Sequence, residues 1–368
     1  MNIWLKSAKE IIVVAPKIPS APMGIETAYL HNKISFRKIP AITILNFSEV
    51  IRSLIKLPGI FYKIMKAMKE ADHIHLRCPG NICLIACIVQ IFFPRKIKTV
   101  KYAGNWDLEA NQPWTYKLQK WILSNTFLTR NITVLVYGNW PGKSKNILPF
   151  FTATFSECEI KKNEKDLGPP YKFLFVGNLV PGKQPIFALH LIEALKEKHI
   201  NAELHVYGDG PLKYNLENEA ENKDYIHLYG NQKLEVLKQA YKDAHFVILA
   251  SKSEGWPKAV AEGMFFGCIP IATAVSCVPW MLNYGSRGIL IPGIEQSVGK
   301  RGKLGDYLVD RGQRTVGSQE VLGETVERII GLLQKPEEMK RMSREAQEWS
   351  QEYTLEKFEE EIKKVLKV

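Results

Sequence analysis

Glu254 and Glu262 lie eight positions apart, on either side of the predicted start of a helix. The apolar residues 245–250 predict a buried strand, Pro257 suits the first position of a helix, and Gly267 suits a helix stop. Glu254 should therefore lie in the turn and Glu262 inside the helix. At about 1.5 Å per helical residue, the two carboxylates should lie on the order of 10 Å apart, with the free N–H groups of the helix start between them.

This separation selects among the reactions that two carboxylates support. It is too large for the close carboxylate pair of a glycosidase. It fits a ligand with an anionic middle and hydroxyl-bearing ends, because the phosphates can lie at the helix N-terminus while a carboxylate accepts hydrogen bonds at each end. A nucleotide-sugar has that shape.

The elements that must position these glutamates follow a regular order. Short apolar runs alternate with longer helix-like segments, which predicts an α/β fold with parallel sheets covered by helices. The strand-like runs are residues 11–15, 41–45, 73–76, 99–102 and 133–136 in the first half, and 173–176, 203–207, 225–228, 245–249, 269–272 and 288–291 in the second.

A length of 368 residues suits two domains. The segment 161–171 is charged and then continues as Gly-Pro-Pro, so we expect one domain over residues 1–167 and a second over residues 168–349. The end of the chain, residues 350–368, is expected to be helical and to pack back on the first domain. The polar, glycine-rich residues 293–317 predict a loop.

Positive charge is concentrated in the first half. Residues 1–170 contain 24 Lys and Arg against 11 Asp and Glu, a net charge of +13, which leaves −1 for the rest of the chain. Such a charge attracts anionic lipid headgroups, diphosphates or nucleic acid. A predicted helix over residues 57–70 places Lys63, Lys66 and Lys69 on one side, which suits an anionic membrane surface. A helix packed on the sheet with solvated lysines is the favoured alternative. Basic and aromatic residues are not interleaved as in nucleic-acid-binding modules, so nucleic acid is not expected as a partner.

The six cysteines show no paired CxxC spacing and lie mostly in apolar segments, which predicts reduced core residues and a cytoplasmic location. They are Cys78, Cys83, Cys87, Cys158, Cys268 and Cys277. The N-terminus has no signal-peptide pattern, and the longest apolar stretch, residues 82–93, is too short to span a bilayer. We expect a protein that is soluble, or peripheral on the inner face of the plasma membrane.

Three glycine turns follow predicted strands in the second half. Residues 173–176 run into Gly177 and Asn178, and Lys183 precedes the next helix. A glycine turn with a lysine before a helix can cradle a diphosphate, although a plain strand-to-helix turn is about as frequent for such a segment alone. Gly208 lies in a tight turn after a strand, and Gly230 closes another strand where the backbone could approach a base.

In this order, and together with the two glutamates, these motifs resemble the nucleotide-binding domain of retaining glycosyltransferases of family 4. That family has the GT-B fold, in which two Rossmann-like domains with parallel sheets face a central cleft. The resemblance covers most of residues 173–292 and is looser in the first half. It implies that Glu254 contacts the donor sugar, Glu262 binds the ribose and Lys183 neutralises the diphosphate, with Glu254 and Lys183 as the catalytic residues. The further donor-binding positions that it implies are Gly177, Asn178, Gly208, Gly230, Gly255, Trp256 and Lys258, of which Gly255 and Trp256 would offer backbone N–H groups. The alternative for the two glutamates is a turn cap and a solvated helix residue.

Two positions depart from the family pattern. The family usually has Arg where Asn178 stands, so half of the usual cationic clamp is missing and Lys258, or a lysine of the first half, is the candidate replacement. In the first half, Gly24 and Glu26 resemble the family's glycine loop, which faces the cleft, but Met23 replaces one glycine.

Asn105, Trp106 and Asp107 follow a strand at the place where many relatives carry a His-Asp pair. Asn105 and Asp107 could bind an acceptor and Trp106 could stack on a sugar, or the loop packs its aromatic side chain into the core. No catalytic histidine can be carried over. His73 and His75 alternate on one predicted strand and are expected to be interior histidines with satisfied hydrogen bonds.

The resemblance implies an enzyme that moves a sugar from a nucleotide-sugar donor to a saccharide or lipid-linked saccharide acceptor, with retention of configuration. It implies no cofactor and no metal, and no DxD-type metal site is visible. A nucleotide-sugar epimerase or a phosphorylase of the same fold, and an inactive nucleotide-binding scaffold at a membrane surface, remain as alternatives. The sequence does not identify the donor sugar, decide between UDP and GDP, or name the acceptor.

Overall fold

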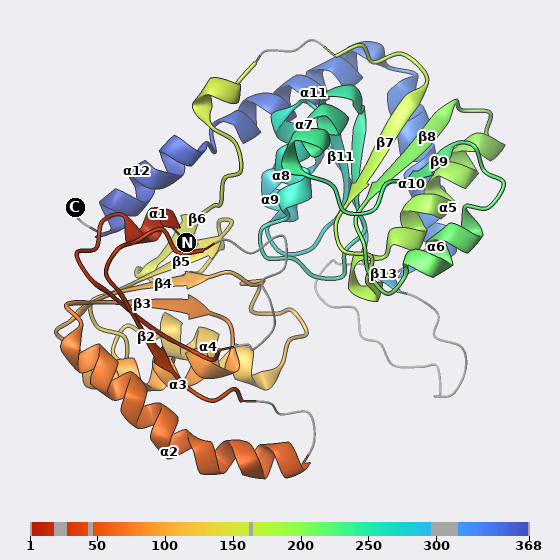
Figure 1. The fold of residues 1–368 in the computed structure, drawn as a ribbon. Coiled ribbons are helices and arrows are strands. Elements are labelled where there is room, and N and C mark those ends of the chain that lie inside the picture. The colour runs from red at the N-terminus through yellow and green to blue at the C-terminus, as the bar shows by residue number, and fades with distance from the viewer. Residues whose placement is uncertain (1, 18–27, 43–46, 162–164, 296–315, 367–368) are drawn as a thin grey trace. The chain divides into compact units, whose positions relative to one another are not determined.

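The computed structural model describes residues 2–17, 28–42, 47–161, 165–295 and 316–366 (Figure 1). The chain divides into two compact units, Met1–Phe151 with Glu356–Val368, and Thr152–Leu355. The sequence suggested a boundary after position 167. The division comes earlier because the connecting segment packs on the second unit, where the ring of Phe155 lies 4.9 Å from the rings of both Phe265 and Phe266.

The first unit contains a four-stranded parallel sheet in the order β3-β4-β5-β6 and a parallel pair, β1-β2. Its strands are β1 (Ile11–Ala15), β2 (Ile34–Lys38), β3 (His73–Cys78), β4 (Ile97–Tyr102), β5 (Ile132–Tyr137) and β6 (Ile147–Phe150). Its helices are α1 (Asn2–Leu5), α2 (Phe47–Glu70), α3 (Asn81–Val89), α4 (Trp114–Ser124) and α12 (Leu355–Leu366), with a 3-10 turn over Gln90–Phe92. Apolar side chains of α2, α3 and α4 pack with those of the sheet in one core.

The second unit is built on a six-stranded parallel sheet in the order β12-β11-β10-β7-β8-β9. Its strands are β7 (Tyr171–Val176), β8 (Ala202–Tyr207), β9 (Ile226–Leu228), β10 (Phe246–Leu249), β11 (Ile269–Thr273) and β12 (Ile289–Ile291), with a short pair, β13 (Ile294–Glu295) and β14 (Val316–Gly317). Its helices are α5 (Pro185–Glu197), α6 (Lys213–Glu219), α7 (Leu234–Asp243), α8 (Lys258–Phe265), α9 (Val278–Met281), α10 (Ser318–Leu333) and α11 (Pro336–Gln351). Short 3-10 turns lie at Glu157–Glu159, Pro181–Lys183 and Asn283–Gly285.

Alternate residues of the second sheet enter two cores, one on each face. Phe173 and Phe175 of β7 pack with α5 and α10, whereas Leu174, between them, packs with the side of the sheet that holds Tyr241 of α7 and Phe265 of α8. Helices therefore cover both faces, as parallel sheets require. The predicted α/β fold with parallel sheets is confirmed, and all six strands expected in this half are present.

The first half differs more from expectation. β2 and β6 were not predicted, because β2 is a short segment with only two apolar residues and β6 is interrupted by Pro149. Of the strand expected over residues 41–45, residues 43–45 lie outside the described part, as does most of the loop expected over residues 293–317. The helical end of the chain is present but broken, since α11 ends at Gln351 and α12 begins at Leu355.

One cysteine prediction is wrong. Cys78 at the end of β3 and Cys83 in α3 form a disulfide, with their Cα atoms 5.7 Å apart. The turn between the strand and the helix brings the two residues together although their spacing is not CxxC. The buried Cys87 lies beside them, with its Sγ 3.8 Å from that of Cys78, while Cys158 is exposed. Cysteine usage therefore gives no basis for a reducing compartment.

The two strand histidines are partly buried, and the prediction that their hydrogen bonds are satisfied holds only in part, because Nε2 of His75 has no hydrogen-bond partner among the described residues. Nε2 of His73 and Nδ1 of His75 lie 2.9 and 2.8 Å from the hydroxyl oxygen of Thr99. Burial, the largest cause, lowers the pKa of His75 to about 3, so this imidazole is neutral at physiological pH.

Among the described residues, the structure contains no helix with the length and apolar character needed to cross a bilayer.

Candidate active site

Backbone hydrogen bonds join the segments that follow the carboxyl ends of β7, β8 and β9. The N–H of Gly177 donates to the carbonyl of Tyr207, and the N–H of Gly208 donates to the carbonyl of Gly230, both at 2.9 Å. A Cβ atom at Gly208 would lie 1.9 Å from the carbonyl oxygen of Gly177, and its φ of 154° is one that other residues rarely adopt. Three of the four glycines predicted to bind the donor therefore follow the ends of adjacent strands, and position 208 requires a glycine.

The strand order locates the place in this sheet where a ligand is expected. β7 is central, and the chain leaves it first toward β8 on one side and later returns to β10 on the other. In open parallel sheets, ligands bind outside the carboxyl ends of the strands at such a switch point. The turns after β7 and β10 are the ones that carry Lys183 and Glu254.

Lys183 and Glu254 form an ion pair between Nζ and Oε1. Lys183 ends the 3-10 turn after β7, and the turn after β10 is fixed to it by a 2.9 Å hydrogen bond from the N–H of Lys252 to the carbonyl of Gly182. The Glu254 side chain is 8% exposed and that of Lys183 is 31% exposed. The structure thus brings together the two residues to which the resemblance gave the sugar and the diphosphate.

Helix α8 begins one residue later than predicted. Pro257 is the residue before the helix, and its carbonyl accepts hydrogen bonds from the N–H groups of Val260 and Ala261. Lys258 is the first helical residue and is exposed. Gly267, with φ of 77°, follows the end of the helix as expected.

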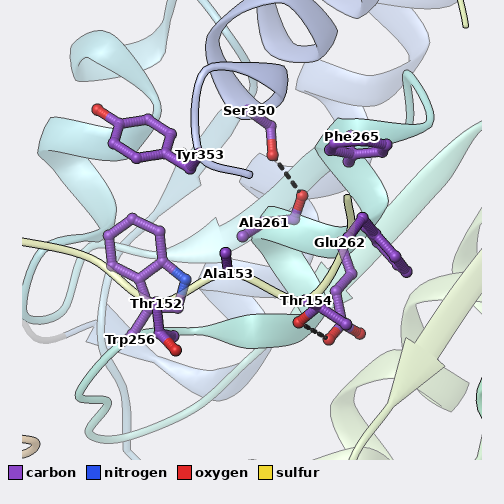
Figure 2. Close-up of a pocket in the computed structure, with 10 residues that line it drawn as sticks. Thr152, Ala153, Thr154, Trp256, Ala261, Glu262, Phe265, Ser350 and Tyr353 are labelled. Carbon is purple, nitrogen blue, oxygen red and sulfur yellow. Dashed lines mark hydrogen bonds between the residues drawn. The ribbon is translucent and has the colours of Figure 1, made fainter. Parts of the chain in front are cut away.

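Glu262 has two polar partners of its own, and Figure 2 shows the hydrogen bond with one of them, Thr154. Its Oε1 accepts a hydrogen bond of 2.8 Å from the hydroxyl of Thr154, and its Oε2 accepts one of 3.1 Å from the hydroxyl of Tyr241. Burial raises the pKa of this carboxyl group against the opposing effect of the two hydrogen bonds. The cavity that it lines is about 10 Å³, room for about one water molecule. A ribose at this carboxylate would therefore need the space beside it to widen.

Three other expected donor residues have distinct settings. Trp256 is 7% exposed, and its ring packs on Trp349 and Tyr353 at centroid distances of 6.3 and 5.8 Å, so only its backbone could face a ligand. The carbonyl of Gly255 accepts a 3.2 Å hydrogen bond from the thiol of Cys277. Asn178, in the turn after β7, is exposed.

The residues expected to face an acceptor receive less support. Gly24 and Glu26 lie outside the described residues. The prediction that Trp106 stacks on a sugar is wrong, because this side chain is 2% exposed in the core of the first unit, edge-on to Tyr102 at 4.9 Å. The alternative, a loop that packs its aromatic into the core, holds.

Asn105 and Asp107 shape that same loop. The side-chain oxygen of Asn105 accepts from the N–H of Asp107, and that of Asp107 accepts from the N–H of Glu109, both at 2.9 Å. Lys120 donates to the carbonyl of Asp107 at 2.5 Å. These bonds give both residues a local structural role.

Sequence reasoning missed Thr154 and Tyr241 as partners of Glu262, because they lie 108 and 21 positions away from it. It also missed a group of ligand-type side chains, namely Glu203, His205 and His227. The alternation of Glu203 and His205 on one strand, with a histidine on the next, was the available signal.

Comparisons with known proteins point to glycosyltransferases. Residues 156–297, which contain the six-stranded sheet and the Lys183–Glu254 pair, match the family Glycosyl transferases group 1. An uncharacterised glycosyltransferase of Methanocaldococcus jannaschii, MJ1178, is 27% identical over 210 residues, which is 56% of this chain and 50% of that protein. The chain thus spans about half the length of this curated relative.

Several solved structures have a similar fold. Sucrose-phosphate synthase of Thermosynechococcus elongatus has a TM-score of 0.62 at 16% identity, over 100% of this chain and 90% of that one. Anabaena HepE, solved with UDP and glucose, has a TM-score of 0.60 at 13% identity, over 91% and 86%. TarM has a TM-score of 0.57 at 16% identity, over 85% of this chain and 58% of that one. At these identities the likeness concerns the fold, and it bears out the predicted fold class.

Proposed function

We propose that this chain is a retaining glycosyltransferase of family 4 that moves a sugar from a nucleotide-sugar to a saccharide or lipid-linked saccharide. The observation that carries the proposal is the Lys183–Glu254 ion pair at the switch point of the second sheet. It lies within the residues that match Glycosyl transferases group 1. Anabaena HepE, a structural neighbour solved with UDP and glucose, supports a nucleotide-sugar as the donor.

On this proposal, each end of the donor has its own residues. Lys183 and the N–H groups at the start of α8 hold the diphosphate, and Lys258 is the candidate to replace the missing arginine. Glu254 accepts hydrogen bonds from the sugar, and Glu262 binds the ribose. The base lies on the backbone surface at Gly208 and Gly230.

The transfer needs no protein nucleophile. The acceptor oxygen bonds to the anomeric carbon on the face from which the diphosphate leaves, the bond from carbon to phosphate oxygen breaks, and that phosphate oxygen takes the acceptor proton. Lys183 and the helix N–H dipoles stabilise the negative charge that develops on the leaving diphosphate. No cofactor takes part in these steps.

A panel of nucleotide-sugars tests the proposal against its alternatives. Release of a nucleoside diphosphate in the presence of a saccharide acceptor, with a glycosylated product, supports transfer. A changed sugar on an intact nucleotide would indicate an epimerase, and sugar 1-phosphate formed from a glycan and phosphate would indicate a phosphorylase. Binding of a donor without turnover under any acceptor would favour a scaffold.

Transfer should survive chelation of divalent cations. Because Lys183 and helix N–H groups take the place of a cation at the leaving diphosphate, the initial rate in excess EDTA should stay close to the rate without it. The measurement is nucleotide release with the active donor from the panel. Complete loss of activity that manganese restores would contradict the metal-independent mechanism.

We infer a lipid-linked acceptor from the positive charge of the first unit. On this proposal, the enzyme acts at the inner face of the plasma membrane. Lys63, Lys66 and Lys69 are exposed on α2, and the same helix exposes Ile55 at 75% and Tyr62 at 65%. Lys63 is partly engaged, since its Nζ donates to the carbonyl of Lys38 at 2.9 Å. Basic and apolar side chains on one exposed helix suit the surface of an anionic bilayer, where a lipid-linked acceptor resides.

Binding to vesicles should depend on this lysine face. Each lysine contributes about 1 kcal/mol near an anionic surface, screened over roughly 8–10 Å at physiological salt. The protein should therefore co-sediment with anionic but not neutral liposomes at low ionic strength and be released by salt. Changing Lys63, Lys66 and Lys69 to glutamate should abolish most of this binding.

The matched control changes three exposed lysines of the second unit, Lys233, Lys335 and Lys340, to glutamate, which alters the net charge equally. This control should still bind. Equal partition to neutral and anionic vesicles, or equal binding of the two triple variants, would contradict the membrane role. It would favour the alternative, in which α2 packs on the sheet and its lysines are only solvated.

A further inference from the structure

Three side chains with metal-binding groups lie together on the β8–β9 edge of the second sheet. Glu203 and His205 are two positions apart on β8, so both point to the same face. His227 of β9 pairs directly with His205 across the parallel register. Because β9 is the edge strand, the face is only partly covered there, and Glu203 and His205 are 29% and 14% exposed.

Their distances are close to those of a coordination site. One ligand atom from each residue lies within 4.8 Å of the other two. Nε2 of His205 is 3.3 Å from Oε2 of Glu203, and the rings of His205 and His227 have centroids 4.7 Å apart. Around Zn²⁺, tetrahedral ligands at about 2.0–2.1 Å lie roughly 3.3 Å from one another, so the atoms need to approach by no more than about 1.5 Å.

A fourth residue orients one of the histidines. The hydroxyl of Tyr229 lies 3.0 Å from Nδ1 of His205, and the two rings are parallel within 5°. A metal-bound histidine almost always uses its second ring nitrogen for such a hydrogen bond, which fixes the tautomer and the ring orientation. With Nδ1–H donating to the Tyr229 oxygen, the lone pair of Nε2 points to the side where Glu203 lies.

We infer that Glu203, His205 and His227 bind one divalent transition-metal ion, for which Zn²⁺ is the reference. Two imidazoles and one carboxylate are a donor set suited to Zn²⁺ and its neighbours, and water can complete a tetrahedral shell on the exposed side. Binding exchanges hydration water for three protein ligands and involves no redox step.

This site is separate from the proposed chemistry. Its residues lie within β8 and β9, whereas the donor groups belong to the turns after β7 and β10 and to the glycines at the strand ends. The other cluster of potential ligands among the described residues is Cys78, Cys83 and Cys87, in which two thiols are joined in a disulfide. A test must therefore distinguish nitrogen and oxygen ligands from sulfur.

Calorimetric titration of the full-length, chelator-treated protein with Zn²⁺ should give one site per chain. His227→Gln and Glu203→Gln should each lower the affinity at least about tenfold, because each removes one of three ligands. The matched control is His190→Gln, which removes an imidazole that also has a carboxylate partner, at 3.1 Å from Glu219, but no second histidine beside it. This variant should bind as the wild type does.

Two further measurements keep the test decisive if a variant folds poorly. At the same Zn²⁺ concentration, the Tm of the wild type and of His190→Gln should rise more than that of His227→Gln. X-ray absorption of the zinc-loaded wild type should show nitrogen and oxygen scatterers at about 2.0–2.1 Å. Absence of binding, equal affinity in His227→Gln and the wild type, or sulfur at about 2.3 Å would overturn the assignment.

Discussion

Replacing Glu254 by glutamine should lower kcat roughly 10²-fold while leaving the affinity for free UDP or GDP unchanged or slightly higher. The Glu254 carboxylate is almost fully buried and paired with Lys183. The amide keeps the shape but loses the charge that strengthens hydrogen bonds to the sugar in the transition state. It also releases Lys183 from its anionic partner, so the lysine is more available to a diphosphate. Single-turnover kinetics and calorimetry with UDP and GDP measure the two effects separately.

Glu262→Gln should give the opposite pattern. Loss of charge-assisted hydrogen bonds to the ribose costs about 1.5–3 kcal/mol, so the nucleotide diphosphate should bind roughly 10- to 150-fold more weakly. The control is Glu235→Gln, an exposed glutamate at the start of α7 in the same unit, which should leave both quantities unchanged. If Glu254→Gln and Glu262→Gln weakened the free nucleotide equally, the assignment of the two glutamates to opposite ends of the donor would be wrong.

The second sheet was predictable because its central strands are buried on both faces. Their apolar runs are continuous, such as the FVIL of β10. Two strands, β7 and β8, are followed directly by a glycine, and at Gly208 the close contact with the backbone of Gly177 requires one. β2 lacked this signal because only two of its five residues, Ile34 and Phe36, are apolar, and Phe36 is exposed. Burial on both faces, rather than strand propensity, therefore decided which strands could be predicted from the sequence.

The candidate site also has features that the sequence could predict and features that it could not. The Lys183–Glu254 pair was predictable, since parallel strands place the turns that follow them along one edge of the sheet. The burial of Trp106 was not predictable, because the same loop sequence allows an aromatic side chain to pack into the core or to bind a sugar. The cysteine pair and the partners of Glu262 depend on how turns and connecting segments fold back, which local spacing does not encode.

Lys183→Ala should lower kcat/KM and donor affinity together. The lysine ends the turn after β7 and is the cation that the ion pair holds at the switch point. A hydrogen bond from an ammonium group to phosphate is typically worth about 1.5–3 kcal/mol, which corresponds to roughly 10- to 150-fold. In the free enzyme Lys183 is paired with Glu254, so its bond to phosphate replaces an existing ion pair when the donor binds, and the observed loss should lie toward the lower end. Calorimetry with UDP and GDP, beside initial rates, provides the measurement.

The same substitution should also affect folding, and the two effects can be separated. Removing Lys183 leaves the 8% exposed Glu254 carboxylate without its cationic partner, so Tm should fall. Lys183→Arg keeps the charge and should retain most of the Tm, while its longer, planar group should not restore kcat/KM fully. The matched control is Lys252→Ala, an exposed lysine in the adjoining turn, which should change neither quantity. A Lys183→Ala variant with a lowered Tm but wild-type kcat/KM would make the lysine a structural partner of Glu254 and exclude it from the donor site.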